Sequence, residues 1–472
     1  MKNSAFEHNM RPCLSFVAIA ALGACTAPAF AAGLECSRAA TSTEKAICAD
    51  ENLRKLDVQL STVYGRLASA QPAQRGALRR AQVDWLKTRD RCGADTSCIA
   101  TRHEERLTAL QTQLRDVNAY KPDDVDREAL EELHQAVEAM RKTDTEFPLE
   151  KVIDALSIKT GTTSFSNTRD GNRSGEDAHF PTIQPKGVTA DEWRALRASG
   201  IEGGGENGAG SYTLMDIDGD GQRDLVIDSY VGGTGLFNEI SVLRRKGAKF
   251  GGIGAPTAVG QSDESEPSSL YTTNGRGSNQ SGQWIRLRGR VYAAYRNSHY
   301  GVDDVYLLRP LTVVGDVPTL TVRYRYRLSI PKVQKNEEKG TSTTLDDVLH
   351  AALTRALGLV DTREARDIGP ADKPLCPVPE GTSDDDRSNY TSYGPGHYSY
   401  EIVGDVPVHI GPQCYIGRLV DWFGGYSAKG KLFASFSVRK PIDGDREQSY
   451  TVQGVRTVIG TATSISKFDI GN

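Results

Sequence analysis

The chain has 472 residues, of which 38% are apolar and 25% are charged, and its formal net charge is −4. This composition excludes a collagen, a wholly disordered chain and a polytopic membrane protein. It also argues against a nucleic-acid-binding protein, because there is no excess of basic residues to neutralise phosphates. The length predicts two or three domains, and 47 Gly with 18 Tyr suggest many strands and turns.

The first residues, 1–31, have the pattern of a signal peptide. Basic residues precede an apolar run at 13–24, which is too short to span a bilayer comfortably. Ala29-Phe30-Ala31 then offers a cleavage site with small residues at both ends. We therefore expect a periplasmic or secreted protein. The alternative is a lipid-anchored envelope protein, since residues 22–25 also resemble a lipobox, and only a lipid on Cys25 would then bring the chain to the membrane.

Six cysteines follow the signal segment, and an even number in an exported chain predicts disulfides. They are Cys36, Cys48, Cys92, Cys98, Cys376 and Cys414. No CxxC pair occurs and no His stands at zinc-finger spacing, so a structural zinc site is not expected. Cys376 and Cys414 are expected to pair with each other.

Residues 32–118 predict an antiparallel bundle of three helices. Thr41 to Glu44 form a capping box, and apolar residues then recur at three- and four-residue steps up to Leu67. Pro72 suits the start of the second helix, and a third helix has one apolar face between Ile99 and Val117. A bundle this small needs covalent support.

The four cysteines of this bundle allow three connectivities. If the second helix returns antiparallel to the first, Cys92 ends near Cys48, which leaves Cys36 for Cys98. Trp85 is expected in the core, and Asp57 with Arg89 is expected to form a partly buried ion pair.

The bundle resembles a known family, the LprI-like lysozyme-inhibitor N-terminal domain of exported bacterial proteins. The resemblance covers residues 36 to about 115 and lies in Cys36, the segment 44–48 ending in Cys48, Leu53, Leu56, Asp57, Tyr64, Gln82, Trp85, Leu86, Arg89, Asp90, Cys92 and Cys98. It implies an exported helical module, in some members linked to inhibition of lysozyme. Lysozyme, or another cationic envelope protein, is accordingly the expected partner.

Residues 119–157 predict an acidic helix and a linker. Between 122 and 138 there are seven acidic residues and one basic residue. Such a run is most often a solvated helix face. The sharper hypothesis is that this face meets a cationic partner, and lysozymes are strongly cationic.

Residues 158–335 predict a β-rich domain that holds a calcium loop. Asp216, Asp218, Asp220 and Asp224 occupy positions 1, 3, 5 and 9 of the loop, with Gly221 at position 6. Carboxylates so spaced can surround a hard cation, and the carbonyl of Gln222 would add a backbone ligand. Ile227 stands where an EF-hand needs Glu, and strands flank the loop, so it resembles the calcium sites of integrin-type FG-GAP repeats. The alternative is an acidic hairpin turn without metal, and in either case the role expected is structural.

The remaining segments are a linker with a short helix at 336–365 and a C-terminal β-rich segment at 366–472. Within the β-rich domain, Arg323, Arg325 and Arg327 alternate with apolar residues, which predicts a strand with one basic face. That face is expected to be solvated, with binding of an anionic cell-wall glycan as the alternative.

No catalytic motif emerges, and no catalytic residue is predicted. Gly203, Gly205 and Gly208 match a dinucleotide loop by letters, but a strand follows them where a helix is required. His299 and His397 stand in loop-like contexts. The sequence thus predicts a multidomain α plus β chain, with a disulfide-stapled helical bundle followed by a β-rich sandwich or partial propeller. The function predicted is that of an exported envelope-binding protein, and the alternative is a glycan-binding protein or a hydrolase that the bundle targets, because a pair of carboxylates acting on a glycan would carry no local motif.

Overall fold

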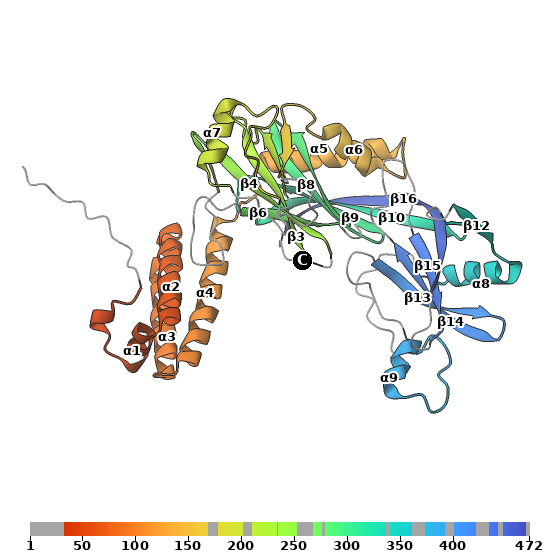
Figure 1. Cartoon of the computed structure of the whole chain (residues 1–472), viewed down its shortest axis with the longest axis horizontal. Coiled ribbons are helices and arrows are strands. Elements are labelled where there is room, and N and C mark those ends of the chain that lie inside the picture. Colours follow the sequence, from red (N-terminus) through yellow and green to blue (C-terminus); the bar gives the residue numbers. More distant parts are fainter. Residues whose placement is uncertain are drawn as a thin grey trace, which may run out of the picture. The chain divides into compact units, whose positions relative to one another are not determined.

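The computed structural model describes residues 33–168, 178–201, 210–233, 235–252, 268–275, 279–336, 340–360, 373–391, 401–421, 434–441 and 447–468. The predicted signal segment, the glycines at 203–208 and His397 lie outside these ranges. The chain divides into two compact units, residues 1–110 and 111–472. The fold class is α plus β, as predicted, with helices and disulfides first and antiparallel sheets afterwards (Figure 1).

The helices of the first unit follow the predicted order, with one additional break. Their bounds are η1 (Cys36–Arg38), α1 (Ser42–Ala49), α2 (Glu51–Ala70), η2 (Pro72–Gln74), α3 (Arg75–Arg89), η3 (Asp90–Cys92) and α4 (Thr96–Asn118), whose last residues pass into the second unit. Thr41 and Glu44 form the predicted capping box at the start of α1. Ile47, Leu53 and Ile99 are the fully buried centre of a small apolar cluster.

Asp50 interrupts what the apolar periodicity predicts as one continuous first helix. Its backbone is extended, with φ −109° and ψ 124°, and its side chain caps α2 by accepting hydrogen bonds from the N–H groups of Asn52 and Leu53. An aspartate in this geometry satisfies amide groups that would otherwise lack partners at the start of a helix. The chain therefore changes direction between α1 and α2.

Two antiparallel sheets make up most of the second unit. The six-stranded sheet contains β1 (Thr163–Ser166), β2 (Gly210–Met215), β3 (Asp224–Gly232), β4 (Phe237–Lys246), β5 (Lys249–Gly251) and β6 (Ser268–Asn274). The eight-stranded sheet contains β7 (Gln280–Leu287), β8 (Arg290–His299), β9 (Val302–Leu308), β10 (Asp316–Ser329), β13 (Glu401–Ile410), β14 (Gln413–Asp421), β15 (Ala434–Arg439) and β16 (Gln448–Lys467). A separate hairpin pairs β11 (Val333–Asn336) with β12 (Thr341–Thr344).

The eight-stranded sheet joins segments that the sequence analysis assigned to different domains. Its order is β13-β14-β15-β16-β10-β9-β8-β7, so the long strand β16 lies between β15 and β10 (Figure 1). Strands from 158–335 and from 366–472 therefore share one sheet and one core cluster.

Helices cover the sheets on two sides. α5 (Asp124–Arg141), α6 (Pro148–Leu156) and α8 (Asp347–Leu357) pack on the eight-stranded sheet, in a cluster that includes Leu133, Tyr292 and Leu353. The alternate residues of β8, such as Ala293 and Tyr295, face the six-stranded sheet instead. α7 (Ala190–Ala198) covers the far side of that sheet. These layers follow from the two-residue period of the strands, because each strand contributes to a core on both of its faces. A short helix α9 (Asp384–Arg387) and η5 (Ser388–Tyr390) complete the described elements.

Candidate functional site

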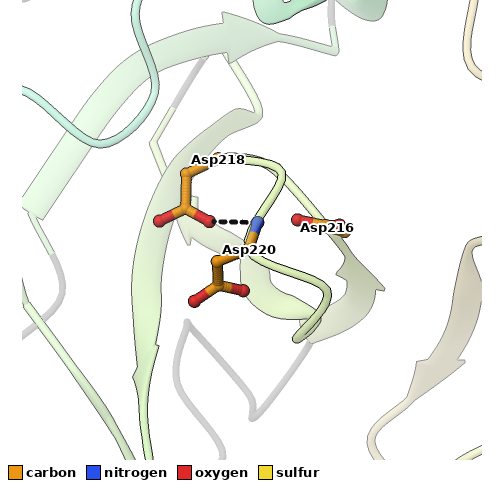
Figure 2. A group of neighbouring side chains, drawn as sticks. All are labelled: Asp216, Asp218 and Asp220. Carbon is orange, nitrogen blue, oxygen red and sulfur yellow. Dashed lines mark hydrogen bonds between the residues drawn. The ribbon is translucent and has the colours of Figure 1, made fainter.

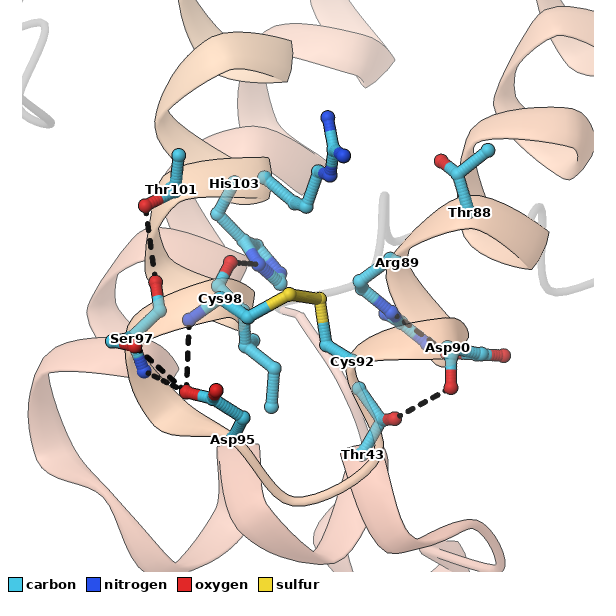
Figure 3. The surroundings of a disulfide bond; sticks show 12 residues. Thr43, Thr88, Arg89, Asp90, Cys92, Asp95, Ser97, Cys98, Thr101 and His103 are labelled. Atoms are coloured by element: carbon cyan, nitrogen blue, oxygen red, sulfur yellow. Dashed lines mark hydrogen bonds and ion pairs between the residues drawn. A yellow bond between two sulfur atoms is a disulfide. The ribbon is translucent and has the colours of Figure 1, made fainter.

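Two short-range disulfides hold the turns of the first unit. Cys36 pairs with Cys48, with 5.6 Å between their Cα atoms, and Cys92 pairs with Cys98, with 5.7 Å. Figure 3 shows the second bond, which closes the turn between η3 and α4. At the same turn Asp95 caps α4, since its carboxylate accepts hydrogen bonds from the N–H groups of Ser97 and Cys98.

The predicted pairing of Cys36 with Cys98 and of Cys48 with Cys92 is wrong. It assumed one straight first helix that carries Cys48 alongside the second helix. The break at Asp50 leaves Cys48 on α1, the short helix that begins six residues after Cys36. Cys376 and Cys414 form the third disulfide, the pair that the sequence analysis expects.

A buried polar cluster links α2 and α4. His103 is fully buried on α4, and its Nδ1 donates to the carbonyl of Ile99 at 2.9 Å. Its Nε2 lies 3.5 Å from the carboxylate of Asp57 on α2. The other oxygen of Asp57 accepts a hydrogen bond from the backbone N–H of Leu34, which ties the N-terminal segment to the bundle.

Arg89 is buried as predicted, but its partner differs. It binds Asp90 with two hydrogen bonds of 2.9 and 2.7 Å, whereas Asp57 is engaged with His103 and Leu34. The expected ion pair between Asp57 and Arg89 is therefore not formed, because each group finds a nearer partner.

Trp85 is half-buried and does not lie in the core. Its ring meets the edge of His103 at 5.3 Å between ring centres, and its Nε1 donates to the carbonyl of Arg102. Arg89 is the only buried residue of α3, and Val83 is 45% exposed. α3 thus buries a single residue and leaves Val83 and part of Trp85 open to solvent.

The acids of the helix α5 and of its N-cap lie next to polar or basic groups of the second unit. Asp126 is completely buried and accepts hydrogen bonds from the hydroxyls of Tyr120 and Tyr292 and from Arg290. The other six acids have partners as follows: Asp123 with Arg290, Asp124 with Arg127, Glu128 and Glu132 with Arg288, Glu131 with His134, and Glu138 with Arg141. Several of these pairs are exposed, and contact of the acidic face with a cationic partner stays a prediction.

The predicted calcium loop connects β2 and β3 as a hairpin. Asp216, Asp218 and Asp220 each offer a carboxylate oxygen, and the three oxygens lie within 4.8 Å of one another (Figure 2). Gly219 and Gly221 have φ of 82° and 84°, a backbone conformation that favours glycine. Carboxylates at alternate positions of a tight turn can meet at a common point, and this loop has that arrangement.

The loop carboxylates also accept hydrogen bonds from their own backbone. Asp216 accepts from the N–H groups of Gly219 and Gly221, and Asp220 accepts from that of Gln222. Asp218 lies 3.2 Å from the guanidinium of Arg244. These contacts hold the loop in its turn, and the carboxylates of Asp218 and Asp220 remain partly or fully exposed.

Asp224 is placed differently from the other three acids. It is buried, and its two oxygens accept hydrogen bonds from the N–H groups of Ile217 and Arg245. Burial raises the pKa of Asp224 to about 6, and the charges of Asp218 and Asp220 add to the rise. The structure therefore brings three of the four predicted carboxylates together. The fourth, that of Asp224, instead accepts hydrogen bonds from backbone N–H groups at the base of the hairpin.

The residues considered for catalysis or glycan binding do not converge. His299 is exposed at the end of β8. The adjacent carboxylates of β9 are engaged separately, Asp303 by the hydroxyl of Tyr324 and Asp304 by that of Thr321. Arg325 and Arg327 are exposed on β10, where they alternate with the buried Tyr324 and Tyr326, as the sequence pattern predicts.

No helix within the described ranges is long and apolar enough to cross a membrane. Residues 36–117 match the family model described as Lysozyme inhibitor LprI. Over 89 residues the chain is 36% identical to the protein named Lipoprotein LprI of Mycobacterium bovis and to those of two Mycobacterium tuberculosis strains.

That match covers 18% of this chain and 44% of each relative, so the chain spans less than half the length of the curated relatives. No solved structure matches the chain. The matched residues coincide with the disulfide-stapled helices η1 to α4, and the sheets lie outside the match. The segment 36–117 is therefore similar to the LprI lysozyme-inhibitor family, and the match does not extend to the β-rich unit that follows it.

Proposed function

We propose that the protein is an exported cell-envelope protein whose N-terminal helical unit binds and inhibits lysozyme. The observation that carries the proposal is the family match at residues 36–117, in register with both short-range disulfides. Three disulfides and the signal-like start of the chain support export to an oxidising compartment. The printed name of the relatives, a lipoprotein, supports a cell-envelope location.

The contact surface that we propose is the exposed side of α3. This helix leaves Val83 largely exposed and Trp85 half-exposed. Tryptophan is enriched among the few residues that supply most of the binding energy in protein interfaces. The basic residues of α3 outnumber its single acid, Asp84, so a cationic lysozyme gains no long-range attraction there. Salt screens the repulsion between like charges, so we expect binding not to weaken between low and physiological salt.

The test is the clearing of a cell-wall suspension by lysozyme, measured by turbidity as the full mature chain is titrated. The wild-type chain should slow clearing, and Val83→Asp should weaken the inhibition about tenfold, because a charge would be buried in the contact. Val333→Asp is the matched control, since Val333 is 47% exposed on β11 of the other unit. Clearing at the uninhibited rate in a large excess of wild-type chain would refute the proposal.

We also propose that calcium binds the β2–β3 loop and stabilises the second unit. The proximity of the three loop carboxylates supports this proposal, because a bound cation would reduce the repulsion between their negative charges. The ion would be held by the carboxylates of Asp216, Asp218 and Asp220 and by the carbonyl of Gln222. Asp224 would hold the base of the loop through its hydrogen bonds from the backbone. The affinity expected for such an extracellular module is on the order of 10⁻⁴–10⁻³ M.

The calcium proposal is tested by calorimetric melting with millimolar calcium and with EDTA. Calcium should raise the melting temperature of the second unit and leave that of the first unchanged. Asp220→Asn should abolish the shift, whereas Asp385→Asn, an exposed acid on α9, should retain it. Superimposable melting curves in calcium and EDTA would exclude the site.

A further inference from the structure

A cavity of about 510 Å³ lies in the second unit where β6 of the six-stranded sheet approaches β7 of the eight-stranded sheet. Its walls come from β2, β3, β4, β6 and β7. None of its lining residues was singled out as a candidate by the sequence analysis, because they stand on five strands spread over more than 70 residues.

The cavity forms because the inner face of the six-stranded sheet changes from apolar to polar along its strands. Met215, Val226 and Val242 pack against the eight-stranded sheet. Thr213 lies two residues from Met215 on β2, and Asp228 lies two residues from Val226 on β3. Both are on the same face of the sheet as those apolar residues, and both line the cavity. The register then continues across the sheet from Asp228 to Ile240 and Tyr271. Polar side chains at this end do not close the space between the sheets with an apolar core, so the gap stays open to solvent.

Gly282 gives the cavity its shape on the β7 side. A Cβ atom at this position would overlap the hydroxyl of Tyr271, so only glycine admits the tyrosine between the two sheets. Gln280 and Trp284 flank Gly282 on the same face of β7, since strand residues two apart share a face. A half-buried indole and a phenol hydroxyl therefore line the space together with an amide.

Several polar atoms of the cavity lack partners within the described part of the chain. The Oε1 atom of Gln280 is buried without a hydrogen bond. Asp228 accepts one hydrogen bond, from the amide of Asn238 at 2.6 Å, and its second oxygen makes none that the described residues supply. Buried or confined acceptors of this kind favour a ligand that brings donors.

The charge of the lining narrows the class of ligand. Among the described lining residues, Asp228 is the one acid and none is Lys or Arg. An anionic ligand such as a phosphate or a uronic acid would meet a carboxylate without a compensating cation. The remaining groups are the hydroxyls of Ser211, Thr213, Thr273 and Ser281 and the amides of Asn238, Asn274 and Gln280.

We propose that this cavity binds a neutral saccharide. Sugar hydroxyls would donate to Asp228 and Gln280, and the apolar C–H face of the ring would lie on the indole of Trp284. The volume is within the range of small-ligand sites and admits one or two sugar rings. The proposal concerns the second unit alone and is independent of lysozyme binding by the first.

The test is isothermal titration of the full mature chain with glucose, N-acetylglucosamine and maltose, and with glucuronic acid as an anionic match to glucose. At least one neutral sugar should bind. Glucose should bind at least about tenfold more tightly than glucuronic acid, because the described lining residues offer no cation to the carboxylate of glucuronic acid. Equal binding of glucose and glucuronic acid, or no heat from any neutral sugar at high millimolar concentration, would overturn the proposal.

Two variants locate the binding. Asp228→Asn keeps the size of the side chain but removes its charge, and it should weaken the sugar about tenfold. Trp284→Ala should abolish measurable binding. Gln283→Ala is the matched control, because Gln283 is exposed on the opposite face of β7. An unchanged affinity in Asp228→Asn, with its melting temperature unaltered, would place the sugar elsewhere and refute the assignment.

Discussion

Glu192 ties α7 to the neighbouring strands. Its carboxylate accepts two hydrogen bonds of 2.7 Å from Arg223 and two more from the backbone and hydroxyl of Thr189. Arg223 immediately precedes β3 and also reaches the hydroxyl of Thr163 on β1. One ion pair thus connects the helix to β1 and to the start of β3.

The pH dependence of stability follows from this ion pair. Burial alone would raise the pKa of Glu192, but the hydrogen bonds from Arg223 and Thr189 outweigh it and lower the pKa to about 2. The unfolded chain has an ordinary glutamate pKa of about 4.3, so it binds the proton more readily than the folded protein between these values. The stabilisation is therefore present above about pH 4.3 and is lost as the pH falls toward 2.

Glu192→Gln should destabilise the second unit by about 2–3 kcal/mol at pH 7, since it leaves Arg223 without its charged partner. The difference from wild type should shrink as the pH is lowered from 4.5 to 2. Urea unfolding at several pH values measures both effects. Glu105→Gln is the control, because Glu105 is a 58% exposed member of a surface pair, and its substitution should cost less than about 1 kcal/mol at every pH. A cost for Glu192→Gln that does not vary with pH would contradict the argument.

At the scale of elements, periodicity and capping residues predict much of the structure. The stripes of α2 and α4, the capping box at Thr41, the strand-flanked acidic loop and the alternation along β10 all appear where the sequence places them. The break at Asp50 has a local signal, because aspartate is a preferred N-cap, yet the apolar stripe continues across it and conceals the change of direction.

Contacts that depend on partners far along the chain had no such signal. The seven acids of α5 suggest a free charged face, but their partners include Arg288 and Arg290, more than 150 residues later. The cavity at Asp228 and Trp284 is likewise assembled by strand register across two sheets. A sequence shows which residues are charged or apolar, whereas the neutralisation of those charges depends on topology.

The disulfide pattern tests the bent arrangement of α1 and α2. Non-reducing proteolysis and mass spectrometry should yield peptides linked through Cys36–Cys48 and Cys92–Cys98, together with Cys376–Cys414. In a denatured chain that lacks residues 1–31 no thiol should titrate, because the six remaining cysteines are paired. A peptide that links Cys48 to Cys92 would restore the straight first helix and contradict the break at Asp50.

At the scale of the whole molecule, the second unit is held together by a buried ionic network as well as by its apolar core. Arg456 of β16 is 2% exposed, and it binds the carboxylate of Glu150 and donates to the carbonyl of Glu146 at 2.9 Å. Arg296 of β8 reaches the same carboxylate of Glu150 at 3.0 Å. One glutamate of α6 therefore binds two arginines that are 160 residues apart in the sequence and lie on different strands.

The network makes distant segments of the second unit depend on one another. The guanidinium of Arg456 also lies over the rings of Phe147 and Tyr324, at 4.8 and 4.3 Å from their centres. A buried charge that loses its partner typically costs 3–5 kcal/mol, far more than a surface pair. A substitution at Glu150 should therefore destabilise both the eight-stranded sheet and the helix α6 that packs on it.

Glu150→Gln should lower the melting temperature of the second unit by several degrees, as expected for a loss of about 3 kcal/mol in a unit of this size. The first unit, residues 1–110, should melt as in the wild type, because Glu150 and its partners all belong to residues 111–472. Differential scanning calorimetry resolves the transitions, and Glu131→Gln, at a 54% exposed position on α5, serves as the matched control. If the substitution at Glu150 shifted every transition by the same amount, the two units would unfold as one cooperative body, and the division of the chain at residue 110 would not describe its energetics.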